Sequence, residues 1–79
     1  MPRFYFHLHN HADVSDESGK ELPDLEAARA HAISLARFEV SEAAKRDGCI
    51  VLSHHIDVED ENGASLATVN FRDAVNITP

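Results

Sequence analysis

Three histidines, His7, His9 and His11, stand at alternate positions near the start of the sequence. Alternate residues of a β-strand share one face, so this spacing would place the imidazoles side by side. Zinc and nickel sites use neighbouring imidazoles of this kind, and Asp13 continues the alternation with a carboxylate. The pattern predicts a zinc or nickel site at His7, His9 and His11. The alternative is a solvated strand face on which the histidines bind nothing.

A second group of polar residues lies further along the chain, at His54, His55, Asp57 and Glu59. If this segment pairs with the first strand, His55 and Asp57 lie on the same open face as the earlier histidines. The two segments would then offer four ligands together. Cross-strand pairs of histidine and carboxylate are also ordinary sheet surface, so both interpretations stay open.

The sequence offers no group of residues arranged for catalysis. A histidine beside a carboxylate could act as a base, but no Gly-x-Ser-x-Gly or cysteine motif supplies a nucleophile. Cys49 lies in an apolar stretch and is predicted to be a buried, inert thiol. Residues 57–63 carry their glycine at the wrong position for a calcium loop. We therefore expect a protein that is not an enzyme, with no cofactor beyond the metal ion considered above.

The first strand is expected over residues 3–10, where apolar and polar residues alternate. Its inward side would be Phe4, Phe6 and Leu8, and its outward side Tyr5 with the histidines. Residues 11–22 are expected to form a loop with at most a short strand. The Asp-Glu-Ser-Gly of residues 16–19 has a counterpart in the Asp-Glu-Asn-Gly of residues 60–63, and both are predicted to be turns.

A long helix is predicted over residues 25–46, a stretch rich in alanine with no glycine or proline. Apolar residues recur there at spacings of three and four and define a face toward the sheet: Leu25, Ala28, Ala32, Leu35, Ala36, Val40 and Ala43. Asp24 is placed to cap the first turn, and Gly48 to end the helix in the left-handed conformation. The small alanines would let the helix approach the sheet closely while the phenylalanines of the first strand fill the space between.

Two further strands are expected over residues 54–60 and 64–71. The Asn-Gly pair at residues 62 and 63 between them is a strong hairpin signal. The odd spacing of Leu66 and Val69, which cannot both face the core of a regular strand, indicates a bulge or a change of face.

These elements combine into one small domain over residues 1–79. We expect an α+β fold of two layers, in which one long helix packs on a small, mainly antiparallel sheet of three or four strands. A chain of this size buries only about 60% of the surface that its unfolded form exposes, and a single cysteine cannot form an internal disulfide. A metal, a partner chain or good packing is therefore needed for stability.

Charge and composition exclude several classes of partner. Fourteen acidic against seven scattered basic side chains give a net charge of −7, which repels phosphate backbones, so we expect no nucleic-acid partner. No apolar run approaches the roughly eighteen residues of a membrane span, and no signal peptide is recognised. With one unpaired cysteine, these observations favour a cytoplasmic location away from membranes.

Several stretches of the sequence resemble a catalogued family. They are the opening Pro-Arg-Phe-Tyr-Phe-His and residues 16–30, 56–63 and 69–74. Over nearly its whole length the chain resembles a family of small bacterial proteins known as domain of unknown function 6894. The resemblance implies no activity, since the family has no established one. His7 matches the Phe-His of the family pattern, whereas His9 and His11 depart from it, which favours the solvated-face interpretation.

Three functions are compatible with these observations. The leading hypothesis is a small cytoplasmic, non-enzymatic interaction or regulatory module that self-associates and can bind a protein partner. The second is divalent-metal binding through the His-x-His-x-His strand, and the third is an antitoxin-like partner protein, by fold-level analogy alone. For self-association we expect a homodimer through Phe38 on the flank of the helix, with Leu35 and residues 50–52 nearby.

Overall fold

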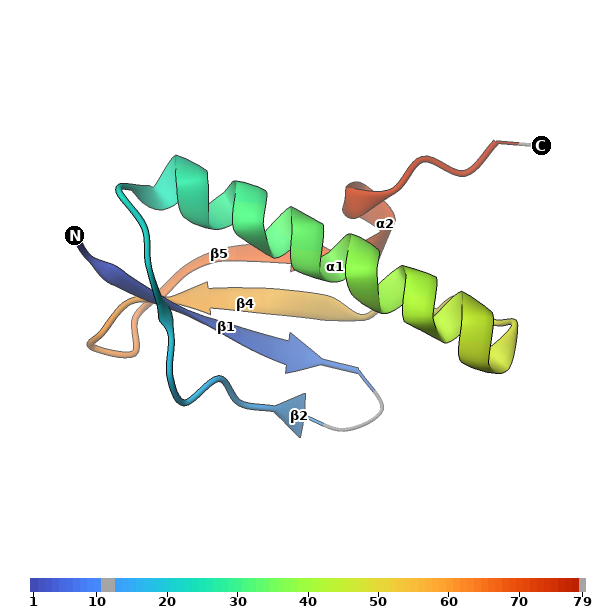
Figure 1. Ribbon diagram of the computed structural model, residues 1–79, viewed down its shortest axis with the longest axis horizontal. Helices are drawn as coiled ribbons and strands as arrows, with labels where there is room; N and C mark the ends of the chain where they lie inside the picture. The colour runs from blue at the N-terminus through green and yellow to red at the C-terminus, as the bar shows by residue number, and fades with distance from the viewer. Residues whose placement is uncertain (11–12, 79) are drawn as a thin grey trace.

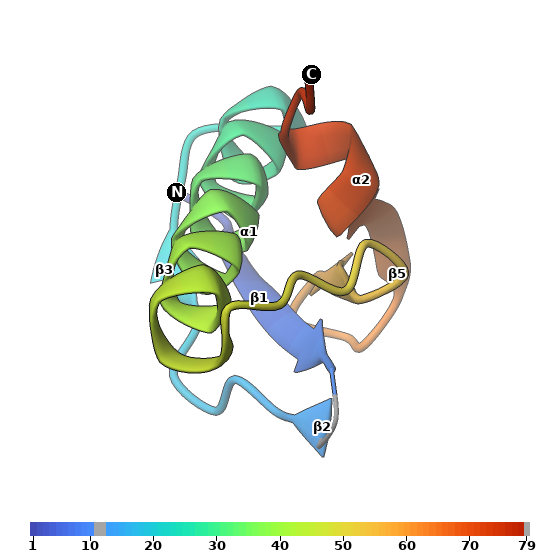
Figure 2. The same cartoon turned by 90° about the vertical axis from the view of Figure 1, so that its right-hand side faces the viewer.

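The computed structural model describes residues 1–10 and 13–78 of the chain. Its elements follow in the order β1 (Arg3–His9), β2 (Asp13–Val14), β3 (Lys20–Glu21), α1 (Leu25–Asp47), β4 (His55–Glu59), β5 (Ser65–Asn70) and α2 (Phe71–Ala74). One sheet forms one layer, and α1 and α2 lie together on one of its faces (Figures 1 and 2). The expected α+β architecture of a long helix on a mostly antiparallel sheet is confirmed.

The sheet has five strands, so the expectation of three or four was wrong. The strand order is β2-β1-β4-β5, and β3 also pairs with β1. Two very short strands therefore share the outer edge of β1: β3 pairs near its start, at Phe4↔Lys20, and β2 pairs near its end, at Leu8↔Val14. The stretch expected to be a loop thus supplies two strands, each too short to show any periodicity in the sequence.

The side chain of Asp16 fills the gap between β2 and β3. Its Oδ2 atom accepts a hydrogen bond from the backbone N–H of Phe6 at 3.1 Å, as a neighbouring strand would. Its Oδ1 atom accepts from the N–H groups of Ser18 and Gly19, which closes the predicted turn. Asp60 does the same for the second predicted turn, accepting from two backbone N–H groups of the β4–β5 connection.

The helix α1 begins and ends as the sequence predicts. The Asp24 carboxylate accepts a hydrogen bond from the N–H of Ala27 at 2.8 Å, which satisfies a donor that the helix itself leaves unpaired. At the other end Gly48 adopts the left-handed conformation, with φ 62°, and its N–H donates to the carbonyl of Ala44. The predicted range of residues 25–46 is one residue shorter than the observed helix.

The core lies between this helix and the sheet, and alanines on one side meet aromatic and branched residues on the other. The buried members are Phe4, Phe6, Ala28, Ala32, Ala36, Val40, Ile56, Val58, Val69, Phe71 and Ala74. Leu25 was expected to join them but is 39% exposed, because it occupies the first position of the helix. Three of the alanines are fully inaccessible, which confirms the close approach predicted for this pair of layers.

The strands β4 and β5 form the predicted hairpin, and the predicted bulge lies within it. Val58 pairs with Ala67, whereas the next residue, Glu59, pairs with Ser65. Leu66 is therefore the extra residue of β5. The strand β5 ends one residue earlier than expected, because α2 begins at Phe71. Arg37 of α1 holds α2 in place by donating a hydrogen bond to the carbonyl of Ala74.

Cys49 was predicted to be buried, and this was wrong, because its side chain is exposed. It directly follows the glycine that ends α1, so the chain there runs over the surface despite its apolar sequence. Within the part of the chain that the structure describes, no helix combines the length and apolar character needed to cross a lipid bilayer.

Candidate functional site

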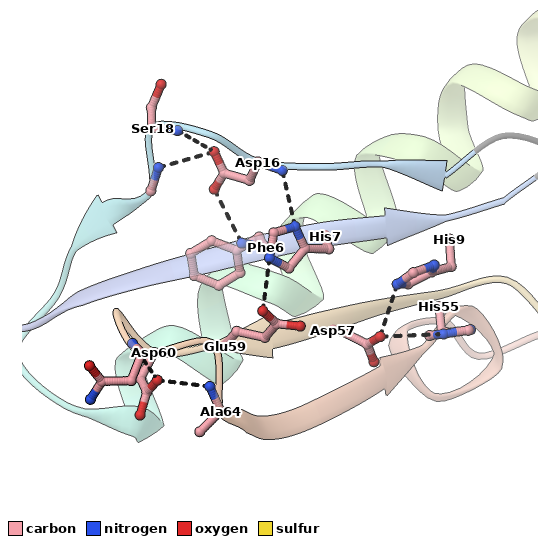
Figure 3. Close-up of polar contacts among 12 residues, drawn as sticks. Phe6, His7, His9, Asp16, Ser18, His55, Asp57, Glu59, Asp60 and Ala64 are labelled. Atoms are coloured by element: carbon pink, nitrogen blue, oxygen red, sulfur yellow. Dashed lines mark hydrogen bonds and ion pairs between the residues drawn. The ribbon is translucent and has the colours of Figure 1, made fainter.

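The face of the sheet opposite the helices carries the polar side chains of β1 and β4. Antiparallel pairing sets His9 directly opposite His55 and His7 directly opposite Asp57. The two segments therefore meet the condition set in the sequence analysis, and His55 and Asp57 share an open face with His7 and His9. Figure 3 shows the resulting row of imidazoles and carboxylates along the two strands.

Three of these side chains converge on one point. The Nε2 atom of His9 lies 2.9 Å from Oδ2 of Asp57, and the Nε2 atom of His55 lies 3.8 Å from the same oxygen. The two imidazoles stack at a centroid distance of 4.7 Å and an interplanar angle of 22°. One ligand atom from each of the three residues can be chosen so that all lie within 4.8 Å of one another. A group of this kind could hold a metal ion.

Two neighbouring groups hold the converging side chains in place. The Nδ1 atom of His9 lies 2.9 Å from Oδ1 of Asp13 on β2, so this carboxylate orients the ring and leaves Nε2 toward Asp57. The hydroxyl of Thr68 on β5 donates to Oδ1 of Asp57 at 2.9 Å and leaves Oδ2 for the histidines. Metal-binding histidines and carboxylates are usually oriented by such outer contacts.

The electrostatic environment of His9 favours its charged form. The hydrogen bond that His9 donates to the Asp13 carboxylate raises the pKa of His9 above 6.5, and the nearby charge of Asp57 adds to the effect although desolvation opposes it. These contacts favour the imidazolium form of His9, which lies between the Asp13 and Asp57 carboxylates. A divalent cation bound at the same place would replace its Nε2 proton.

His7 lies on the same face but takes no part in this cluster. Its Nδ1 atom accepts a hydrogen bond from the backbone N–H of Asp16 at 3.1 Å, so its proton is on Nε2, which lies 3.2 Å from a carboxylate oxygen of Glu59. Both ring nitrogens are thus engaged. The Asp16 side chain is itself fixed: burial alone would raise its pKa, but the backbone N–H groups of Gly19, Phe6 and Ser18 bring the pKa below 3.8.

The site predicted at His7, His9 and His11 is therefore rearranged in the structure. His9 is a member of the converging group, His7 is held elsewhere, and His11 lies outside the described residues. The other two members, His55 and Asp57, come from the second polar segment of the sequence. The role of Thr68 had no signal in the sequence, because it depends on the register of β5 against β4.

The fold and this site define a small α+β domain with a polar, histidine-bearing sheet face. A family model described as domain of unknown function (DUF6894) matches residues 3–72. The chain belongs to this family. Comparison with curated proteins and with solved structures gave no match.

Proposed function

We propose that this domain binds one divalent transition-metal ion on its open sheet face through His9 Nε2, His55 Nε2 and Asp57 Oδ2. The observation that carries the proposal is the convergence of three ligand atoms within 4.8 Å, from two paired strands. Contacts from Asp13 to His9 and from Thr68 to Asp57 support it, because these orient the ligands toward a common point.

The distances fit an ion of the size of zinc. Ligand atoms at about 2.05 Å from a tetrahedral ion lie about 3.3 Å apart. The separations of 2.9 Å and 3.8 Å from Asp57 Oδ2 to the two imidazole nitrogens bracket this value.

The ligand types select the class of ion. Two imidazoles and one carboxylate suit zinc, nickel or copper, whereas magnesium and calcium prefer sites made of oxygen atoms. Three protein ligands leave one tetrahedral position for water or for a group supplied by another molecule. The proposed role is metal binding in a regulatory or interaction module; the self-association, cytoplasmic location and antitoxin-like partnership expected from the sequence stay predictions.

The experiment is a calorimetric titration of chelator-treated protein with Zn²⁺ at pH 7.5, repeated with Co²⁺ followed by visible absorption. We expect one ion per chain and a tetrahedral cobalt spectrum. His9→Ala and His55→Ala should abolish binding, and Asp13→Asn should weaken it about 10–100-fold through the orientation of His9. His7→Gln is the matched control, because it changes a histidine of the same strand face that is already engaged by Asp16 and Glu59.

The pH dependence provides a second readout. Zinc must displace the proton from His9, whose pKa is raised, so the affinity should fall steeply as the pH is lowered from 8 to 6. Absence of binding at pH 7.5, or a loss in His7→Gln as large as in His9→Ala, would contradict the proposal.

A further inference from the structure

One ridge of α1 points away from the sheet and is covered by no other element among the described residues (Figure 2). It runs along the helix at steps of three or four residues through Glu26, Ala30, Ser34, Phe38, Ser41 and Lys45, and all six are exposed. We call these six residues the outer ridge. Phe38, near its middle, leaves 58% of its surface exposed.

The charges of the outer ridge are confined to its two ends. Its four central positions, from Ala30 to Ser41, carry no charge, although 27% of all residues in this acidic chain are charged. Glu26 stands in the first helical turn and Lys45 in the last, so the ends have opposite signs. A large apolar residue among small uncharged ones, between opposite charges, is a surface suited to another helix.

The outer ridge is complementary to its own reverse order, because its ends differ in the sign of their charge and the large Phe38 corresponds to the small Ser34. A two-fold axis across α1 between residues 35 and 36 would set Glu26 against the partner's Lys45. The same axis sets Ala30 against the partner's Ser41 and Phe38 beside the partner's Ser34. In this arrangement the large Phe38 of each copy packs against small residues of the other copy, and opposite charges face each other at both ends of the ridge.

We propose that two copies of the chain associate through the outer ridge, with their α1 helices antiparallel about this axis. The charge pattern determines the direction, because parallel helices would place Glu26 against Glu26 and Lys45 against Lys45. Antiparallel helices also oppose their dipoles favourably. The occupant is a second copy rather than an unrelated partner, because the ridge is complementary to itself. The association is independent of the metal site, which lies on the other side of the sheet.

The first test is sedimentation equilibrium of the full chain between 1 and 500 μM, in the presence of a chelator so that no ion can link two copies. We expect a mass approaching twice the chain mass of 8.7 kDa, and Phe38→Ser should return the protein to the single-chain mass. Leu66→Ser is the matched control, because Leu66 is also exposed, at 38%, but lies on β5. A single-chain mass throughout, or a dimer that survives Phe38→Ser, overturns the proposal.

The second test examines the direction of the helices by charge exchange. Glu26→Lys and Lys45→Glu should each weaken the dimer about fivefold or more, because each creates two like-charged contacts about the axis. The double variant restores both contacts with the charges exchanged and should recover the original dissociation constant. Circular dichroism of each variant separates an effect on helix stability from an effect on association. Failure of the double variant to recover, with the helix intact, excludes the antiparallel arrangement.

Discussion

Phe6 is one of the aromatic side chains that pack between the sheet and the helix α1. It is 7% exposed at the centre of β1, pairs in register with the fully buried Val58, and meets the ring of His31 from α1 edge-on at a centroid distance of 4.7 Å. Desolvation under this contact lowers the pKa of His31 below 6.5. Phe6→Ala would therefore remove both a core ring and the aromatic partner of a helix residue.

The expected cost can be compared with the total stability of the domain. Truncation of a buried phenylalanine to alanine costs about 3–5 kcal/mol, including the aromatic contact. A chain of 79 residues has a free energy of unfolding of about 4–12 kcal/mol in all. The alanines that face Phe6 cannot extend to fill the space, so little of the loss is recovered by repacking. The loss is therefore about a quarter of the total stability at the high end of this range and exceeds it at the low end, where the variant would be unfolded at 25 °C.

Urea titration followed by circular dichroism measures the effect, and Tyr5→Ala is the matched control. Tyr5 is the neighbouring residue of the same strand but lies on the open face and is only half-buried, so its loss should cost about 1 kcal/mol. If Phe6→Ala costs less than about 2 kcal/mol, or no more than Tyr5→Ala, α1 does not cover this part of the sheet as described.

Two further predictions concern the turns and the charged histidine. Gly19→Ala should destabilise the fold by about 2 kcal/mol or more, because at φ 69° the new Cβ would lie within 3.0 Å of three atoms of β1. Gly63→Ala is the control: at φ 81°, with open space around it, this change should cost about 1 kcal/mol in the same urea titration. Equal losses would show that Gly19 is not packed against β1. His9 should titrate above pH 6.5 in histidine NMR spectra, and Asp13→Asn should lower the pKa of His9. Because the pKa of His9 is raised in the folded state, the stabilisation that His9 provides is complete below pH 6.5 and is lost as the pH rises through the folded-state pKa. The difference in unfolding free energy between the original protein and His9→Gln should therefore shrink toward pH 9. An unshifted His9 would contradict the contact with Asp13.

Much of the fold could be predicted from local patterns in the sequence. Three predicted features depend only on residues close to one another in the sequence. They are the alternation of β1, the alanine-rich helix with Asp24 and Gly48 at its ends, and the hairpin with its bulge. The strands β2 and β3 were not, because each is two residues long and is defined only by its pairing with β1. Likewise, the apolar neighbours of Cys49 predicted burial, but Cys49 follows the end of α1 and is exposed there.

The candidate site could be predicted only in part, for a related reason. The spacing of His7 and His9 correctly placed both on one face, but it could not show that Asp16 and Glu59 would engage His7. That depends on a turn nine residues away in sequence and on the register of β4. His55 and Asp57 were named as further ligands on the condition that the two segments pair, and the structure meets that condition. The supporting contact from Thr68 required the third strand as well.

The bulge at Leu66 has a consequence for how this sheet behaves at high concentration. β5 is an edge strand that carries no charged or proline residue to discourage a neighbouring chain from adding to it. A regular strand of this composition would be a template for stacking one molecule on the next into fibrils. The inserted residue interrupts the even spacing of outward N–H and carbonyl groups and twists the edge, so an added strand could not stay in register along its length. A single extra leucine thus protects an otherwise uncharged edge from open-ended assembly.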